Sequence, residues 1–179
     1  ILDKSFKIKD KIQISKKINY DNLPHHHCND CFSYKNSIYV TMFSESGNWK
    51  LDSFDGALLE IDLEQKKTVA SLLKNLWMPH NPKIINGSLY VLDSLRGELK
   101  GNNFNVLGSF PAFTRGLAYD GNYFYIGQSR NRNFSRNNGI NNNTSIDTGI
   151  VIFNEEKKMS RFLQVSSKIS EIHSTELFK

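Results

Sequence analysis

The stretch Asn86-Gly87-Ser88-Leu89-Tyr90-Val91 decides the fold class, because it recurs twice elsewhere in the chain. Its counterparts are Lys35-Asn36-Ser37-Ile38-Tyr39-Val40 and Gly121-Asn122-Tyr123-Phe124-Tyr125-Ile126. Each copy is a polar turn followed by a short run of β-branched and aromatic residues, which is typical of a β-hairpin. No long segment shows the apolar spacing of an amphipathic helix. The chain is therefore predicted to be all-β.

Further strands extend each copy into a longer unit. A strand precedes the turn, and the strand after the turn ends near a serine in every unit: Ser44, Ser94 and Ser129. Two more strands are expected in each unit, at 56–63 and 68–73, at 97–100 and 105–110, and at 149–153 and 160–165. Four short strands in about 35 to 55 residues are typical of a β-propeller blade. We predict one β-propeller-like domain over residues 1–179, with blades at about 25–76, 77–112 and 113–169.

Both ends of the chain are expected to hold partial blades. Apolar residues alternate with polar ones over 6–18, which predicts an outer strand, and 170–173 resembles the innermost strand of a further blade. Closed propellers have about four to eight blades, so about three and a half blades do not close a ring. The ring would be completed by the rest of a longer chain, by a second copy, or by the two ends combining into a small fourth blade. We favour the first, because the chain begins and ends within a repeat.

The alignment of the units also predicts a site. It places Asn29, His80 and Arg115 at one equivalent position in the first strand of each blade, and Glu171 at the same position of the next. First strands line the central channel of a propeller, so these side chains should meet at one mouth of the channel. The predicted ligand-binding residues are Asn29, Asp30, His27, His80, Arg115 and Glu171.

The residue types at this position differ, as a functional site would require. Arg115 can hold a carboxylate or phosphate by a two-point fork. His80 can act as acid or base near neutral pH, and Glu171 can act as a base, so these three residues are also the candidate catalytic group. The alternative interpretation is a buried polar network that holds the channel together.

A Cys-x-x-Cys pair lies beside a run of histidines, and it invites a metal or redox interpretation. The weak metal candidates are His27, Cys28 and Cys31. A structural zinc site needs four ligands, and no second ligand pair follows in the sequence. We therefore predict no cofactor and treat the cysteines as small strand residues, with a divalent metal as the alternative.

Two polar segments occupy equivalent places between the second and third strands of their units, 49–55 and 131–147. Each is expected to be a loop, with a lid over a pocket as the alternative. The aromatic residues that directly precede the site motifs, Trp77, Phe110 and Phe113, are expected to fill the core between blades. His173 is expected to lie deeper in the channel than Glu171.

The charge pattern narrows the choice of partners. Lys and Arg total 23 against 18 Asp and Glu, but these basic residues are scattered rather than gathered in a stripe, so nucleic-acid binding is not predicted. No apolar run is long enough to span a membrane, and no signal peptide is visible. We expect a cytoplasmic protein whose partner is a small molecule.

Several motifs in the chain resemble one known family. They are Trp77-Met78-Pro79-His80-Asn81-Pro82, residues 86–94 and 97–98, Phe113-Thr114-Arg115-Gly116-Leu117-Ala118, residues 26–30, and Ser170-Glu171-Ile172. They are similar to a bacterial conserved-hypothetical family, the domain of unknown function numbered four-nine-one-five. The resemblance covers about residues 25–173 and implies a propeller-like fold and a longer full-length protein, but no activity. The chain departs from the family pattern at the turn Leu95-Arg96 and in its Asn-rich loop.

Three functions remain open from the sequence. The first is a propeller that binds a small polar or anionic ligand, such as a sugar, at the channel mouth. The second is a propeller lyase or hydrolase in which His80 and Glu171 perform acid–base chemistry and Arg115 stabilises developing negative charge. The third is a protein-interaction scaffold.

Overall fold

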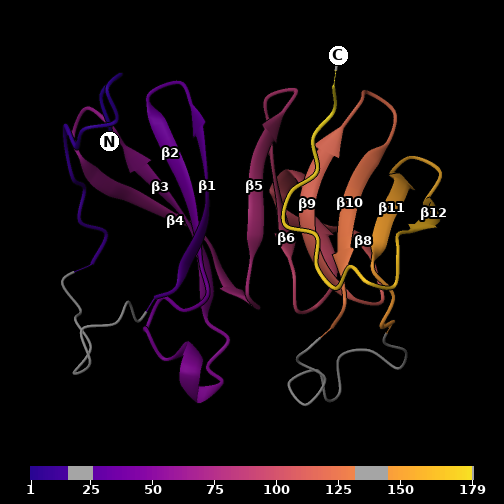
Figure 1. The fold of residues 1–179 in the computed structure, drawn as a ribbon. Coiled ribbons are helices and arrows are strands. Elements are labelled where there is room, and N and C mark those ends of the chain that lie inside the picture. The colour runs from indigo at the N-terminus through magenta and orange to yellow at the C-terminus, as the bar shows by residue number, and fades with distance from the viewer. Residues whose placement is uncertain (16–25, 132–144, 179) are drawn as a thin grey trace.

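The computed structural model describes residues 1–15, 26–131 and 145–178, and these form an all-β structure of three four-stranded antiparallel sheets (Figure 1). The first sheet contains β1 (Cys28–Tyr34), β2 (Ser37–Met42), β3 (Gly56–Asp62) and β4 (Lys67–Leu76). The second contains β5 (His80–Ile85), β6 (Ser88–Asp93), β7 (Glu98–Lys100) and β8 (Val106–Ser109). The third contains β9 (Phe113–Tyr119), β10 (Phe124–Ser129), β11 (Gly149–Asn154) and β12 (Met159–Gln164). Two short 3-10 helices, η1 (Trp49–Leu51) and η2 (Asn102–Phe104), lie in the connections.

Strand order follows chain order in every sheet, because each strand pairs with the next one along the chain. The hairpin between β5 and β6 shows the cause. Ile85 pairs with Ser88, and the two residues between them, Asn86 and Gly87, both have positive φ. Asn-Gly is the preferred sequence for this type of turn, whose twist matches that of the flanking strands.

Apolar side chains join neighbouring sheets face to face. Leu92, Leu99 and Phe110 of the second sheet pack in one cluster with residues of the third sheet that include Phe124 and Phe153. A separate cluster joins the first two sheets: Leu58, Leu76 and Val91. Each sheet therefore buries a face against its neighbour.

The first strands of the three sheets lie next to one another. β1 contacts β5, and β5 contacts β9 (Figure 1). Each first strand shifts register against its second strand at the predicted site motif: at Asn29 in β1, at Asn81-Pro82 in β5 and at Arg115-Gly116 in β9. Such irregularities free backbone groups from the ladder and re-aim side chains.

The freed groups form links between sheets. The carboxylate of Asp30 accepts a hydrogen bond from the backbone N–H of Asn81 at 3.0 Å. The side-chain oxygen of Asn81 accepts one from the backbone N–H of Gly116 at 2.6 Å. Equivalent motif positions thus connect the first sheet to the second and the second to the third.

The outer strand expected at 6–18 is wrong for the part that the structure describes. Residues 1–15 form only an isolated bridge between Leu2 and Ile8, and 16–18 lie outside the described residues. The cause is the carboxylate of Asp3, which accepts hydrogen bonds from the backbone N–H groups of Ser5 and Lys7. This folds the segment into a tight turn, with Phe6 at positive φ and exposed.

The segment 170–173, which resembles an innermost strand in sequence, is extended but forms no strand in the described tail, residues 165–178. The tail runs alongside the third sheet (Figure 1). Arg130 donates its backbone N–H to the Ser170 carbonyl at 2.9 Å, whereas Ile172 donates its own N–H to the side-chain hydroxyl of Ser129 at 2.9 Å. Because a side chain replaces a backbone partner there, no regular ladder forms.

Of the two loops predicted from the sequence, 49–55 contains η1, whereas 131–147 falls mostly outside the described residues, which omit 132–144.

Candidate functional site

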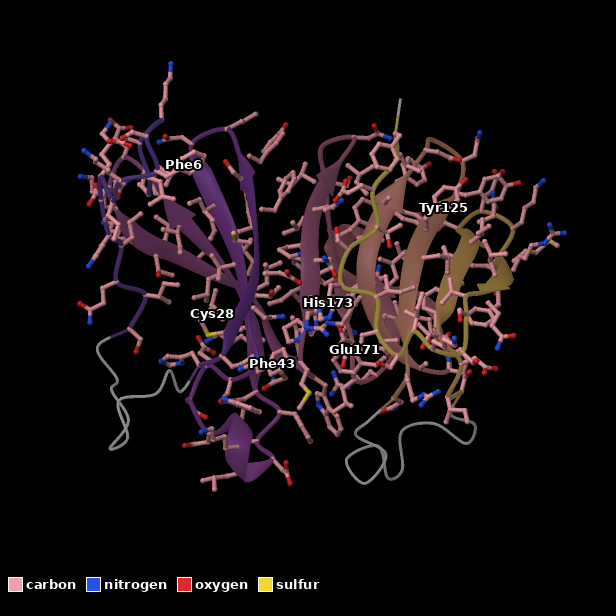
Figure 2. All side chains as sticks on the ribbon, in the orientation of Figure 1. Phe6, Cys28, Phe43, Tyr125, Glu171 and His173 are labelled. Carbon is pink, nitrogen blue, oxygen red and sulfur yellow. The ribbon has the colours of Figure 1, made fainter. Side chains whose placement is uncertain are left out.

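A pocket of about 230 Å³ lies at the starts of the first strands. Its lining includes His27, Phe43, Trp49, His80, Arg115 and Glu171. His80 and Arg115 come from the second and third sheets, and His27 and Phe43 directly flank strands of the first sheet. Trp49 comes from η1 and Glu171 from the C-terminal tail. Figure 2 shows Phe43 on the side of the first sheet and Glu171 on the tail opposite it, near the middle of the molecule. The pocket is thus a place where distant parts of the chain meet.

His80, the first residue of β5, is a deeply buried polar residue of the lining, with 2% of its surface exposed. Its Nδ1 lies 2.9 Å from the carbonyl oxygen of Met78 and 2.9 Å from the hydroxyl of Ser94. A carbonyl oxygen can only accept, so Nδ1 carries the ring proton and Nε2 presents a lone pair. Nε2 is buried and has no hydrogen-bond partner among the described residues.

Burial also fixes the protonation state of His80. It lowers the pKa of the imidazole from 6.5 to about 3, and the nearby positive charge of Arg115 contributes in the same direction. The ring is therefore neutral at physiological pH. Burial and Arg115 lower the pKa of His27 as well.

Arg115, in β9, pairs with Glu171 of the tail. Its Nη1 donates to Glu171 Oε2 at 3.1 Å, and both side chains are about four-fifths buried, with 20% and 19% exposed. The Arg115 guanidinium also lies over the ring of Phe113 at 5.9 Å. Partial burial strengthens this ion pair relative to a surface pair and orients the guanidinium toward the pocket.

The sequence suggested that His173 lies deeper in the channel than Glu171, and this prediction is wrong. Its side chain is 67% exposed, and its Nε2 is 3.1 Å from Glu171 Oε2, so it contacts the carboxylate from the solvent side (Figure 2). The reason is that the tail is extended but not part of a sheet, so strand alternation does not fix which side chains point inward.

Aromatic rings form another wall of the pocket. The His27 ring stacks on Phe43 with centroids 4.2 Å apart and lies 4.6 Å from Trp49. Phe43 and Phe113 contact His80 edge-on, each at 5.4 Å. His80 is thus held between two aromatic rings, which exclude water from it.

Asn29 and Asp30 do not line this pocket. The Asn29 amide donates to the carbonyl oxygen of Pro79 at 2.6 Å, and Asp30 receives the N–H of Asn81. Both side chains therefore join the first sheet to the second. This fits the alternative interpretation of a structural polar network for these two positions, whereas His27, His80, Arg115 and Glu171 are brought together.

The structure gives no metal centre to the Cys-x-x-Cys region. Cys28 and Cys31 are free and exposed, and the His27 ring packs among aromatic side chains instead. Within residues 1–15, 26–131 and 145–178, no group of three or more potential ligands is arranged to hold a metal ion.

Sequence reasoning missed several lining residues: Phe43, Trp49, Met78, Ser129 and Arg130. A signal for two of them existed, since Phe43 and Ser129 lie at the ends of second strands, where the repeat alignment had marked a recurring serine. Trp49 belongs to η1, in one of the two predicted loops, so this loop forms part of the pocket wall.

Taken together, the lining can bind but is poorly suited to proton transfer. It offers two guanidinium groups, Arg115 and Arg130, one carboxylate, Glu171, and a neutral imidazole acceptor beside aromatic surface. These groups match the polar and apolar parts of a small organic molecule.

Comparison with known proteins identifies the family. Residues 21–179 match the family model described as Domain of unknown function (DUF4915), so the chain belongs to this family. A comparison with curated proteins finds no match. No helix in the described part of the chain is long and apolar enough to cross a membrane.

Proposed function

We propose that this member of the DUF4915 family is part of a β-propeller and that its pocket binds a small polar or anionic organic ligand of about sugar size. The binding residues are His27, His80, Arg115 and Glu171, at the mouth of the central channel. The proposal combines the arrangement of the sheets with the chemistry of the pocket.

The sheet arrangement supports a propeller. Three antiparallel meanders follow one another, and their first strands lie side by side, as the inner strands of blades do. Thr114 donates its N–H to the Ser94 carbonyl at 3.3 Å, and Arg130 donates its own to Ser170 at 2.9 Å. In both cases, the residue before the site position meets the end of the preceding second strand. This supports an equivalent place for Glu171 in a fourth blade, which the rest of a longer chain or a second copy would complete.

The single observation that carries the binding function is the unpaired Nε2 of His80. A buried acceptor without a partner costs about 1–3 kcal/mol, and a ligand donor would remove that cost. His80 lines the same pocket as the guanidinium groups of Arg115 and Arg130 and the aromatic rings, so a ligand bound there lies beside this histidine.

Binding is favoured over acid–base catalysis for a physical reason. A histidine whose pKa is about 3 is a weak base at neutral pH, and Glu171 is already paired with Arg115. A lyase or hydrolase activity therefore has no specific observation in its favour, and neither does a scaffold role.

The test is an NMR measurement of the imidazole nitrogens while a mixture of small sugars, hydroxy acids and amino acids is added. We expect one compound class to shift the Nε2 resonance of His80. The matched control is His26, which lies outside the pocket lining. Its Nδ1 lies 2.9 Å from the Ser44 carbonyl, and its Nε2 is also buried without a partner among the residues that the structure describes. Equal shifts at both histidines, or none at either, would refute the proposed site.

A further inference from the structure

Two polar groups of the pocket together specify what a ligand must present. Both residues line the pocket, and among the described residues the buried His80 Nε2 has no donor and the buried Trp49 Nε1 has no acceptor. A ligand that offers both a donor and an acceptor would match these two groups. A hydroxyl group does both, whereas a bare anionic oxygen can only accept.

The charges of the lining specify a second feature. Arg115 and Arg130 bring two positive charges and Glu171 brings one negative charge, while His27 and His80 are neutral because their pKa values are lowered. The guanidinium of Arg115 has five N–H donors, of which one contacts Glu171. The lining therefore has a net charge of one positive, together with several N–H donors, and this matches a ligand with a single carboxylate.

The dimensions specify a third feature. A volume of about 230 Å³ is below the range of roughly 300–1,000 Å³ found for drug-sized ligands. The rings of His27, Phe43 and Trp49, which contact one another, present apolar surface against which the C–H face of a saturated ring can pack. One sugar-sized ring fits these conditions.

We infer that the pocket is selective for a hydroxy-carboxylate of monosaccharide size, with hexuronates as the representative class. This inference rests on the proposed ligand-binding function. The carboxylate lies toward Arg115 and Arg130, and a ring hydroxyl donates to His80 Nε2 and accepts from Trp49 Nε1. Sulfate satisfies the charge but has no proton to donate, so it leaves the His80 acceptor facing oxygen lone pairs. A neutral hexose satisfies the acceptor but leaves a positive charge unmatched.

The experiment is isothermal titration calorimetry with four probes: D-glucuronate, D-galacturonate, D-glucose and sulfate. We expect at least one hexuronate to bind about tenfold or more tightly than glucose, the usual effect of a hydrogen bond to a charged group. Arg115→Gln should abolish this advantage, and Arg115→Lys should restore only part of it, because lysine keeps the charge but lacks the fork. Arg161→Gln, on the exposed strand β12, is the matched control and should bind as the unmodified chain does.

His80→Asn separates the two proposals. It should weaken hexuronate binding about tenfold or more, while His26→Asn leaves it unchanged. Glucose or sulfate binding as tightly as both hexuronates, with loss in His80→Asn, would overturn the selectivity and leave the binding function standing. The selectivity is also overturned if neither hexuronate binds while another small compound shifts the NMR resonance of His80 Nε2. Hexuronate binding that is unaffected by Arg115→Gln and His80→Asn would overturn the binding site itself.

Discussion

Acidification should destabilise the protein through His80, and the size of the effect follows from its burial. In the unfolded chain, the imidazole takes up a proton near its ordinary pKa of 6.5, but in the folded chain only near about 3. Between these pH values the unfolded state binds more protons, so the free energy of unfolding falls as the pH falls. The slope approaches about 1.4 kcal/mol per pH unit, and the loss between pH 7 and pH 5 is about 2 kcal/mol.

The perturbation that isolates this effect is His80→Asn. In the unmodified chain the Met78 carbonyl accepts a hydrogen bond from the Nδ1–H of His80. The asparagine amide can still donate to this carbonyl, but it does not titrate. Other groups change protonation in the same range, notably Asp93. Because they are present in both proteins, their contributions cancel in the difference between the unmodified chain and the variant.

The assay is urea unfolding at a series of pH values from 7 to 5, with the free energy of unfolding obtained by linear extrapolation. The unmodified chain should lose about 2 kcal/mol more than His80→Asn over this interval. If the two proteins lose stability in parallel, to within about 0.5 kcal/mol, then His80 takes up its proton in the folded state and the reasoning from its burial is refuted.

Three further predictions concern buried groups and backbone geometry, and each is measured by chemical unfolding. Burial raises the pKa of Asp93 from 3.8 to about 6, so its carboxylate costs stability above that pH. When the pH falls from 7 to 5, the free energy of unfolding of the unmodified chain should therefore rise by about 1 kcal/mol relative to that of Asp93→Asn. The absence of this relative rise would contradict the assigned burial. Gly97 has φ +67°, and a Cβ added there would meet a backbone carbonyl, so Gly97→Ala should lower the free energy of unfolding by about 3 kcal/mol or more. Gly87 has φ +80° but open space around it, so Gly87→Ala should lower it by about 1–2 kcal/mol. Equal losses would show that the close approach at Gly97 is unimportant. Asn81→Ala leaves the N–H of Gly116 without its side-chain acceptor and should cost about 1–3 kcal/mol, and a change under about 0.5 kcal/mol would mean that the link between sheets is not stabilising.

The repeat pattern was sufficient to predict the sheets. The strands begin and end at 28–76, 80–109 and 113–164, within the predicted units of about 25–76, 77–112 and 113–169. The polar turns and the runs around Tyr39, Tyr90 and Tyr125 are local signals, and local signals determine hairpins. The terminal segments were predicted poorly, because alternation alone does not distinguish a strand from a turn held by a carboxylate such as that of Asp3.

The same reasoning explains the partial success at the site. His80 and Arg115 meet because they occupy equivalent positions of neighbouring sheets, and Glu171 reaches the same pocket from the C-terminal tail. Asn29 occupies the equivalent position, but its amide donates to the Pro79 carbonyl and does not line the pocket. Sequence alignment gives the position of a residue along a strand, but it does not give the partner that the side chain finds across the sheets. The aromatic wall depends on a connection between strands, whose path no periodicity predicts.

Two hydrogen bonds between sheets share a direction along the chain, and this bears on how the chain acquires its structure during synthesis. Asp30 provides the acceptor for Asn81, and Asn81 provides the acceptor for Gly116, so each acceptor precedes its donor in the chain. A ribosome releases the N-terminal part first. Each newly emerging first strand can therefore dock onto a preceding sheet that already presents its acceptor. At Gly116, which has no side chain, the series ends, and the Ser129 hydroxyl holds the tail instead.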